Sequence, residues 1–334
     1  MTSLKDVARY TGLSVSTVSR TLSNKDHVKE YTREKVLEAV RLLNYSPNVV
    51  AQSLKKGRSN TIALMIPSIQ NMIFPDLTRG VEDTARKNGY MVILCNTDED
   101  TNAEKSYIDT LRPRLIDGFI IASMKSHATH IQQLRKENFP VVLALRSYDN
   151  SIDAVIVNNN VAAYNAVRYL IERGHRKIAI TLGNTELNLY SERYKGYAQA
   201  LQKNNIPLDT KLVIRERCNT GNFYYLIKVM LENGTVPDAV FATTDAQAIT
   251  VMRALYDCGY RIPADISVVG FDNVELASLV EPPLSTISQP MYEIGVKAAQ
   301  KLIYQIDYKE KHGVLDEPLI EVAETNLIIR KSTR

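Results

Sequence analysis

The stretch LKDVARYTGLSVSTVSRTL, residues 4–22, decides the fold of the N-terminal part of the chain. Its first half carries apolar side chains at helical spacing from Leu4 to Thr11, and Gly12 then interrupts the pattern. Ser14 is a residue type that caps helices, so a second short helix is expected to begin directly after it. Two short helices joined by a tight glycine turn predict a helix-turn-helix.

The second helix of this pair has two different faces. Val18 and Leu22 form an apolar stripe, and at about 100° per residue Ser16 and Arg20 point almost directly away from it. A hydroxyl and a guanidinium on the outer face suit the major groove, where Arg can read guanine and Ser can bind base edges or phosphate. The spacing alone fits an ordinary helical hairpin with a solvated polar face equally well.

Positive charge is concentrated in the same part of the chain. Of 334 residues with a formal net charge of +4, the first 60 carry 11 Lys/Arg and 5 Asp/Glu, so the remainder is slightly acidic. A compact basic segment ahead of an acidic body is expected if only that segment meets the phosphate backbone of a nucleic acid. A charged, solvated surface without a partner is the alternative that charge alone leaves open.

The sequence disfavours secreted and membrane proteins. Cys95, Cys218 and Cys258 are odd in number and far apart, which argues for a reducing cytosol and against a disulfide framework. The N-terminus lacks an apolar signal core, and no run approaches the ~18 apolar residues of a membrane span. We therefore expect a cytoplasmic chain with no membrane partner.

The sequence also disfavours an enzyme. It contains no glycine-rich dinucleotide fingerprint, no phosphate-binding GK[ST] loop and no nucleophile elbow. His127 and His130 form an H-x-x-H pair, but no cysteine or third histidine lies nearby. We therefore expect no metal site and no cofactor, and we expect both histidines to be exposed.

A third helix and a short fourth one are expected before the linker. Thr32 can cap a helix over TREKVLEAVRLLNY, and its apolar face would complete a small three-helix core. Ser46 and Pro47 form a helix start signal for a segment that ends at Leu54, and the basic segment 55–60 reads as a linker. A helix as short as 47–54 should be mostly unfolded when alone in water.

From Thr61 onward, strand-like apolar runs alternate with amphipathic helical stretches. The runs are TIALMI (61–66), YMVILC (90–95), DGFIIAS (117–123), VVLAL (141–145) and AVIV (154–157), and then KIAITL (177–182), KLVIRE (211–216), AVFATT (239–244) and ISVVGF (266–271). This alternation predicts an α/β fold of parallel sheets covered by helices, and the two series predict two subdomains.

Several ordered blocks beyond the head carry a family resemblance: KKGRSNTIALMIPSI, RYLIERGHRKIAI, ERYKGYAQAL, PDAVFATTDAQAI, IPADISVVGFDN and EPPLSTISQP. Together with the head, they make the chain resemble the lactose-repressor (LacI/GalR) family of bacterial transcription regulators nearly end to end. The resemblance implies a periplasmic-binding-protein-like core whose chain crosses between subdomains near residues 159, 290 and 318. The implied parts are a helix-turn-helix domain (1–45), a hinge helix and linker (46–60), an N-terminal core subdomain (61–158 plus 290–318) and a C-terminal core subdomain (159–289 plus 319–334).

The resemblance also implies roles for residues of the head and hinge. Its base-reading positions fall on Val15 and Ser16, with Arg20 one turn later. Leu54 resembles the family's leucine that is inserted between base pairs of the minor groove, and an apolar wedge of this kind can kink a duplex. The further positions that are expected to contact DNA are Ser14, Thr17, Ser19, His27, Thr32, Asn48 and Lys55.

In the core, the resemblance implies a set of effector-binding residues. Arg193 and Asp272 match positions that grip the effector, and an arginine donor with an aspartate acceptor suits a polyol. Asp272 also directly follows a strand-like run, where open α/β sheets bind ligands. Ile73 and Phe74 match positions that line the cleft, and Phe74 is the expected stacking partner for a sugar ring. Further cleft positions are Arg146, Asn159, Thr244 and Gln289.

Together with these patterns, the resemblance implies a homodimeric DNA-binding regulator, a repressor, that binds a pseudo-palindromic operator and responds to a small-molecule effector, with a sugar or sugar derivative as the expected class. Arg146 and Arg193 leave an anionic effector such as a uronate or a sugar phosphate open. The block QPMYEIG resembles the catabolite-control branch, which uses a phosphorylated carrier protein as corepressor, although Gln300 stands where that branch has Arg. A sugar-binding transport protein is the rival from another class, and the basic head argues against it.

Overall fold

The computed structural model describes residues 2–22, 28–45, 58–113, 116–123, 128–147, 150–184, 187–215 and 222–334. These residues divide into two compact units, Met1–Ser59 and Asn60–Arg334, and each unit is described by itself. Among the described residues, no helix is both long enough and apolar enough to cross a bilayer. The expected hinge segment 47–54, with Asn48, Leu54 and the neighbouring Lys55, lies outside the described residues, as do His27, His127 and Cys218.

The described residues of the first unit form three helices around one small core. They are α1 (Leu4–Thr11), α2 (Val15–Leu22) and α3 (Glu30–Leu42). The core consists of Val7, Ala8, Val18, Val36 and Ala39. The helix-turn-helix pattern read from the sequence is thus present.

The turn between α1 and α2 forms as the residue types require. Gly12 has a φ of 65°, in the left-handed region, and its N–H donates to the last carbonyl oxygens of α1. Ser14 Oγ accepts a hydrogen bond from the backbone N–H of Thr17 at 3.1 Å, which is the bond of a helix N-cap. The predicted cap at Ser14 is therefore confirmed.

The predicted cap at Thr32 is wrong. Helix α3 begins at Glu30, so Thr32 lies in its first turn, where its backbone N–H donates to the Lys29 carbonyl oxygen at 2.9 Å. The extra turn places the carboxylate of Glu30 at the helix N-terminus, where the helix dipole favours negative charge. Glu30, two residues before Thr32, therefore marks the start of the helix better than the hydroxyl of Thr32.

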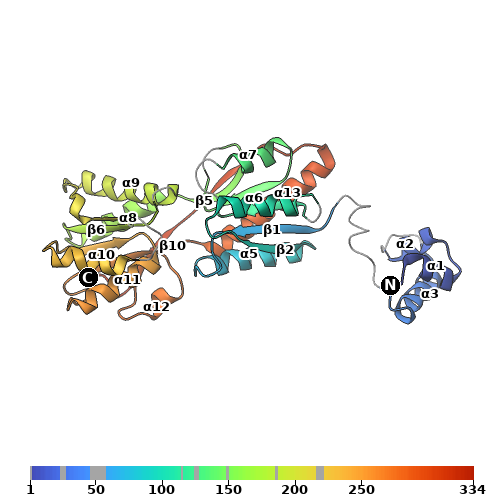
Figure 1. The fold of residues 1–334 in the computed structure, drawn as a ribbon, viewed down its shortest axis with the longest axis horizontal. Helices are drawn as coiled ribbons and strands as arrows, with labels where there is room; N and C mark the ends of the chain where they lie inside the picture. The colour runs from blue at the N-terminus through green and yellow to red at the C-terminus, as the bar shows by residue number, and fades with distance from the viewer. Residues whose placement is uncertain are drawn as a thin grey trace. The chain divides into compact units, whose positions relative to one another are not determined.

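The second unit contains two six-stranded sheets, each with helices on both faces (Figure 1). The first sheet has the order β11-β5-β4-β3-β1-β2, and the second has the order β12-β10-β9-β8-β6-β7. We call the parts built on them the first and the second subdomain. All neighbouring strands are parallel except β10 and β12. The predicted α/β class with two subdomains is confirmed.

The first subdomain is a doubly wound layer structure. Its strands are β1 (Thr61–Ile66), β2 (Met91–Asn96), β3 (Gly118–Ile121), β4 (Val141–Ala144), β5 (Asp153–Val157) and β11 (Ile320–Ala323). Side chains of α5 (Phe74–Lys87) and α13 (Met291–His312) pack with one face of the sheet, and those of α6 (Thr101–Leu111) and α7 (Thr129–Lys136) pack with the other. The inner strands β1, β3 and β4 are buried on both faces, which is why they read as continuous apolar runs, whereas the edge strands β2 and β11 are partly exposed.

The second subdomain repeats this arrangement and contains the C-terminus (Figure 1). Its strands are β6 (Ile178–Leu182), β7 (Val213–Arg215), β8 (Ala239–Ala242), β9 (Ser267–Asp272), β10 (Ser285–Ser288) and β12 (Asn326–Ile328). Helices α8 (Asn159–Glu172) and α9 (Asn188–Lys203) contribute to the core on one face, and α10 (Phe223–Glu232) and α11 (Asp245–Asp257) to the core on the other. The short elements η1 (Thr210–Leu212) and α12 (Leu276–Leu279) lie in the connections.

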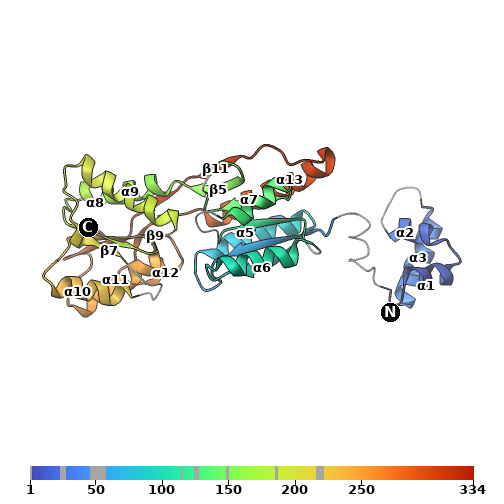
Figure 2. The ribbon, with the colours of Figure 1, turned by 45° about the horizontal axis from the view of Figure 1, so that its top comes forward.

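The chain passes three times between the subdomains. It leaves the first sheet after Val157, returns to the first subdomain between Ser288 and Met291, and leaves again after Ala323. The third passage lies later than the one expected near residue 318, because β11 lies beside β5 in the first sheet, with Ile320 paired to Ala154 (Figure 2). Residues 320–323 therefore belong to the first subdomain.

Candidate functional site

A pocket of about 440 Å³ lies between the two subdomains, at the carboxyl ends of their strands. This is the position at which open α/β sheets bind ligands. All eight residues expected to hold an effector line it, namely Ile73, Phe74, Arg146, Asn159, Arg193, Thr244, Asp272 and Gln289. We call this the cleft pocket. Its lining also includes Ser68, Asn71, Glu99, Leu187, Leu189 and Tyr190, which sequence reasoning did not find.

Arg193 is the most buried charged group of the cleft pocket, with 4% of its surface exposed. Its Nε donates to Asn159 Oδ1 at 2.8 Å, and its Nη1 donates to the Thr243 carbonyl oxygen. The guanidinium lies 3.5 Å from the centre of the Phe271 ring, and Nη1 is 3.9 Å from Asp272 Oδ1. One side chain from α9 thus joins the N-terminus of α8 to the ends of β8 and β9.

Asp272 is the acceptor that faces Arg193. It ends β9 with a φ of 126°, and its Oδ1 accepts a hydrogen bond from Gln289 Nε2 at 2.8 Å. Burial raises the pKa of Asp272 to about 7; the nearby Asp245 also raises it, whereas Arg193 opposes the shift. The carboxyl is therefore poised to change its charge near neutral pH.

A second ion pair lines the cleft pocket from the first subdomain. Arg146 follows β4 and Glu99 follows β2. The two side chains form a bidentate pair, with Nη1 to Oε2 at 3.0 Å and Nη2 to Oε1 at 2.7 Å. Each of the two cleft arginines therefore faces a carboxylate, and the pairing leaves the pocket nearly neutral.

The position of the cleft pocket residues follows from local structure. Asn158 Oδ1 caps α8 by accepting from the Val161 N–H at 3.0 Å, so Asn159 sits in the first turn. Thr244 caps α11 in the same way, with its Oγ1 accepting from the Gln247 N–H at 3.2 Å. Polar groups at helix starts and strand ends therefore converge on one space.

The aromatic lining differs from expectation. Phe74 is only 4% exposed and belongs to the core of the first subdomain. Tyr190 is less buried and is one turn before Arg193 on α9. Its i, i+3 spacing from Arg193 is the signal that could have identified it. Glu99 could have been found because it lies just after the carboxyl end of β2, and Asp272 lies at the carboxyl end of β9.

The outer face of α2 is the second candidate site. Val15 is 42% exposed, and Ser16 and Arg20 are exposed as well, whereas Val18 is fully buried. Ser14 Oγ lies 2.8 Å from both Ser16 Oγ and Thr17 Oγ1, so the hydroxyls form a cluster at the start of α2. Ser19 is partly buried. This face presents hydroxyls and a guanidinium to solvent.

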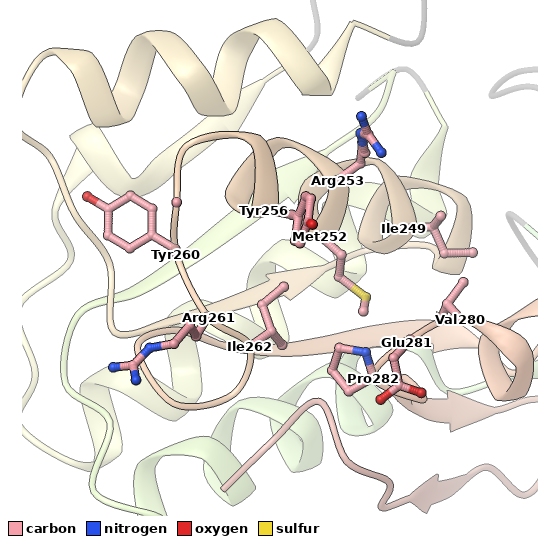
Figure 3. Close-up of a pocket in the computed structure, with 11 residues that line it drawn as sticks. Ile249, Met252, Arg253, Tyr256, Tyr260, Arg261, Ile262, Val280, Glu281 and Pro282 are labelled. Carbon is pink, nitrogen blue, oxygen red and sulfur yellow. The ribbon is translucent and has the colours of Figure 1, made fainter.

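A larger hollow of about 670 Å³ lies elsewhere, on the second subdomain between α11 and residues 280–282 (Figure 3). Its walls are mostly apolar, and it contains none of the predicted site residues. Its two arginines are already paired, Arg253 with Asp257 and Arg261 with Asp265. Tyr256, at its rim, is 72% exposed. The hollow has the character of a protein-contact surface more than of a polar ligand site.

The remaining sequence features concern the side chain of His130 and the question of a metal site. His130 was expected to be exposed, but its side chain is largely buried and its Nε2 lies 2.5 Å from Glu104 Oε1. The same carboxylate accepts a hydrogen bond from Ser123 Oγ at 2.6 Å, so these groups satisfy one another. Within the described ranges, no group of three metal-ligating side chains forms.

Comparison with known proteins identifies both parts of the chain. Residues 3–48 match the model of the bacterial regulatory proteins of the lacI family, and residues 59–322 match that of the periplasmic binding proteins and sugar binding domain of the LacI family. The regulator RegA of Clostridium acetobutylicum is 41% identical over 96% of this chain and 98% of its own. The ribose operon repressor of Halalkalibacterium halodurans is 34% identical over 100% of this chain and 98% of its own. The lac repressor dimer bound to operator and an anti-inducer superimposes with a TM-score of 0.88 at 28% identity, over 99% of both chains.

Proposed function

The chain belongs to the LacI family of bacterial regulatory proteins and is an effector-controlled, DNA-binding transcriptional regulator rather than an enzyme; on that premise we propose that it is a cytoplasmic repressor whose effector is an uncharged sugar or sugar derivative bound in the cleft pocket. The observation that carries the proposal is that each arginine of the pocket faces a carboxyl group, Arg193 facing Asp272 and Arg146 facing Glu99, on the two sides of one pocket. Each pair offers donors and acceptors together, which matches hydroxyl groups.

The charge balance favours a neutral effector over an anionic one, the two classes of effector that the sequence left open. A uronate or a sugar phosphate needs an unpaired cation, but Arg146 already makes two charge-assisted hydrogen bonds to Glu99. Arg193 is held by Asn159 and the Thr243 carbonyl oxygen and faces Asp272. An anion would have to displace a carboxylate that is already in place, so a neutral polyol fits better.

The catabolite-control alternative needs positive charge on α13 to bind a phosphorylated carrier protein, and little unpaired positive charge is present around Gln300. Gln300 is exposed there, and the lysines on either side of it pair with one carboxylate. Lys297 Nζ lies 2.8 Å from Glu321 Oε1, and Lys301 Nζ lies 3.7 Å from Oε2. A phosphorylated carrier protein would have to compete with Glu321 for both lysines.

The effector class is tested by thermal unfolding of the full chain with neutral sugars, uronates, sugar phosphates and purines. A ligand at 100 times its dissociation constant adds about 2.7 kcal/mol to the free energy of unfolding, which is easily detected. We expect neutral sugars alone to stabilise the chain and to change its affinity for operator DNA. Stabilisation by a sugar phosphate but not by its neutral parent would contradict the proposal.

The DNA is proposed to be a pseudo-palindromic operator bound by a homodimer, with one α2 helix in the major groove of each half-site. The proposed interface includes the apolar hollow of Figure 3, because its exposed side chains, Tyr256 among them, would be buried against a second copy. Light scattering of the full chain should give twice the mass of one chain. A monomer at micromolar concentration would refute this part.

We expect Arg20→Ala to relax base preference at one position of each half-site. A bidentate arginine–guanine contact contributes about 1–3 kcal/mol to base discrimination, so affinity for the preferred sequence should fall by about 10- to 100-fold. Selection of bound duplexes from a random library, followed by titration at several salt concentrations, measures both quantities. Arg41→Ala removes the same charge from the exposed end of α3 and is the matched control. Equal base preferences for the two variants would exclude Arg20 from base reading.

We expect the carboxyl of Asp272 to lower stability as the pH rises. Its pKa is raised from an ordinary value near 3.8 to about 7, so the folded state binds more protons than the unfolded state between these values. Stability from this group therefore falls as pH increases from about 4 to 7 and is constant above 7. Asp272→Asn removes the penalty and should be the more stable protein at pH 8, by up to about 4 kcal/mol.

This advantage of Asp272→Asn should shrink as the pH is lowered towards 4, which thermal unfolding at pH 5, 6, 7 and 8 would show. Glu232→Gln, an exposed carboxylate on α10, is the control and should not alter the pH profile. If wild type and Asp272→Asn shared one pH profile, the carboxyl would not titrate as inferred. The same substitution should weaken effector binding, because an amide accepts hydroxyl hydrogen bonds less strongly than a carboxylate.

A further inference from the structure

Two further cavities adjoin the cleft pocket. A second cavity of about 540 Å³ adjoins it and shares four lining residues with it, Asn71, Tyr190, Thr244 and Asp272. We call this the outer cavity. A third cavity, of about 280 Å³, adjoins the cleft pocket at Arg146 and Asn159 instead. The cleft between the subdomains therefore offers more room than the cleft pocket alone.

The outer cavity has a composition that suits an uncharged ring with hydroxyl groups. Among the described residues that line it, Asp272 is the only charged one. Gln70 and Thr250 supply neutral polar groups, and Met72, which is 50% exposed, and Leu276 supply apolar surface. Sugar rings have both kinds of surface, since C–H groups cover their faces and hydroxyls surround their edges.

Tyr190 occupies the boundary between the two spaces. Its ring lies so close to the backbone of Gly183 that a Cβ at residue 183 would be 2.6 Å from Tyr190 Cζ. Glycine at 183 therefore lets the hydroxyl end of the ring lie against the backbone that follows β6, and Tyr190 lines both cavities. Aromatic rings pack well against the faces of sugars, so one ring at a shared wall can contact two adjacent units.

The polar groups at the same boundary are also shared. The carboxyl of Asp272 and the side chain of Thr244 line both cavities, and Arg193 faces Asp272 from the cleft pocket. A carboxylate has two acceptor oxygens and can accept hydroxyl hydrogen bonds from two units at once. From this arrangement we propose that the effector is an uncharged saccharide of at least two linked units, with one unit in the cleft pocket and the next in the outer cavity. The inference rests on the proposed function of the cleft pocket.

The test compares neutral monosaccharides with disaccharides built from the same units, using the full chain and titration calorimetry. Suitable probes are glucose, galactose and xylose with cellobiose, maltose, lactose, melibiose and xylobiose. We expect one disaccharide to bind at least 10-fold more tightly than either of its own monosaccharides. The variant Ala246→Phe places a ring into the outer cavity from the exposed first turn of α11 and should reduce this ratio to about 1.

Two controls make the position of the second unit testable. Val322→Phe fills the third cavity instead, and Val161→Phe adds the same ring at an exposed position of α8 outside all three cavities; both should keep the ratio. A monosaccharide that binds as tightly as every disaccharide would overturn the inference and leave the proposed function standing. Loss of the ratio with Val322→Phe but not with Ala246→Phe would also overturn it. If no saccharide of any length bound, both the inference and the proposed function would fall.

Discussion

Arg193→Ala should reduce effector affinity at least about 100-fold and abolish the response of operator binding to the effector. The side chain joins Asn159, the Thr243 carbonyl oxygen and the Phe271 ring, and it faces Asp272. Its removal leaves a buried carboxyl without its cation and a ligand hydroxyl without its donor. Removing one partner of a buried pair of opposite charges costs about 3–5 kcal/mol, and 2.7 kcal/mol corresponds to 100-fold.

Arg193→Ala should reduce the affinity for the effector and leave the affinity for operator DNA without effector nearly unchanged. The helix-turn-helix belongs to the other compact unit, so operator affinity without effector should change by less than about 3-fold. Arg193→Lys should lose nearly as much effector affinity, because an ammonium cannot donate to Asn159 and Thr243 in the geometry of the guanidinium while lying flat on Phe271. Arg168→Ala, at an exposed arginine of α8, is the control. Effector affinity is measured by calorimetric titration. If Arg193→Ala bound the effector as tightly as the wild type does, Arg193 would not belong to the site.

Gly196→Ala should both destabilise the core and disturb the cleft pocket. Gly196 lies where α9 crosses the start of α8, and a Cβ there would overlap the carbonyl oxygen of Asn160 and lie 2.9 Å from the Tyr164 nitrogen. Backbone atoms of a helix cannot turn aside, so the two helices must separate. Overpacking of this kind costs about 1–3 kcal/mol.

The same separation would act on the site, because Asn159 is on α8 and Arg193 is on α9, only one turn before the glycine. Their hydrogen bond of 2.8 Å should lengthen, so we expect a lower unfolding temperature together with at least 10-fold weaker effector binding. Lys195→Ala, at the exposed neighbouring position, should change stability by less than about 0.5 kcal/mol. A Gly196→Ala protein with unchanged unfolding temperature would show that the helices do not depend on close approach here.

Most of the sheet structure could be predicted because parallel strands are buried on both faces. The runs from TIALMI to ISVVGF are mostly apolar and correspond to β1–β9, although the run of the edge strand β7 is short and flanked by charged residues. The three strands that were not predicted lack such a run. Strand β10 reads STIS, yet it is buried, and its polar groups are satisfied by specific partners: Thr286 Oγ1 donates to Asp245 Oδ1 at 2.6 Å, and the Ser285 N–H donates to Ser332 Oγ at 2.7 Å. These partners are distant in sequence, so the local pattern carries no sign of them.

The site could be predicted less completely than the fold. Arg193 and Asp272 came from the family resemblance, and strand-end reasoning supported Asp272 independently. The pairing of Arg146 with Glu99 could not be foreseen, since it depends on the register of β2 and β4, which lie on opposite sides of β1 and β3 in the sheet. The register is a product of the whole fold. It is also what makes the cleft pocket nearly neutral.

The order in which the chain builds its two sheets has a consequence for biosynthesis. The first subdomain receives α13 and β11 only after strands β6 to β10 of the second subdomain have been translated, and β12 of the second subdomain follows last. Until then, the apolar side chains of β1, β3 and α5 that later pack on Ile294, Ala298 and Leu302 have no cover. The first part of the core to be translated therefore leaves the ribosome as an intermediate with exposed apolar surface. Nascent chains stalled before residue 291 should depend on chaperones, and those released after residue 323 should not.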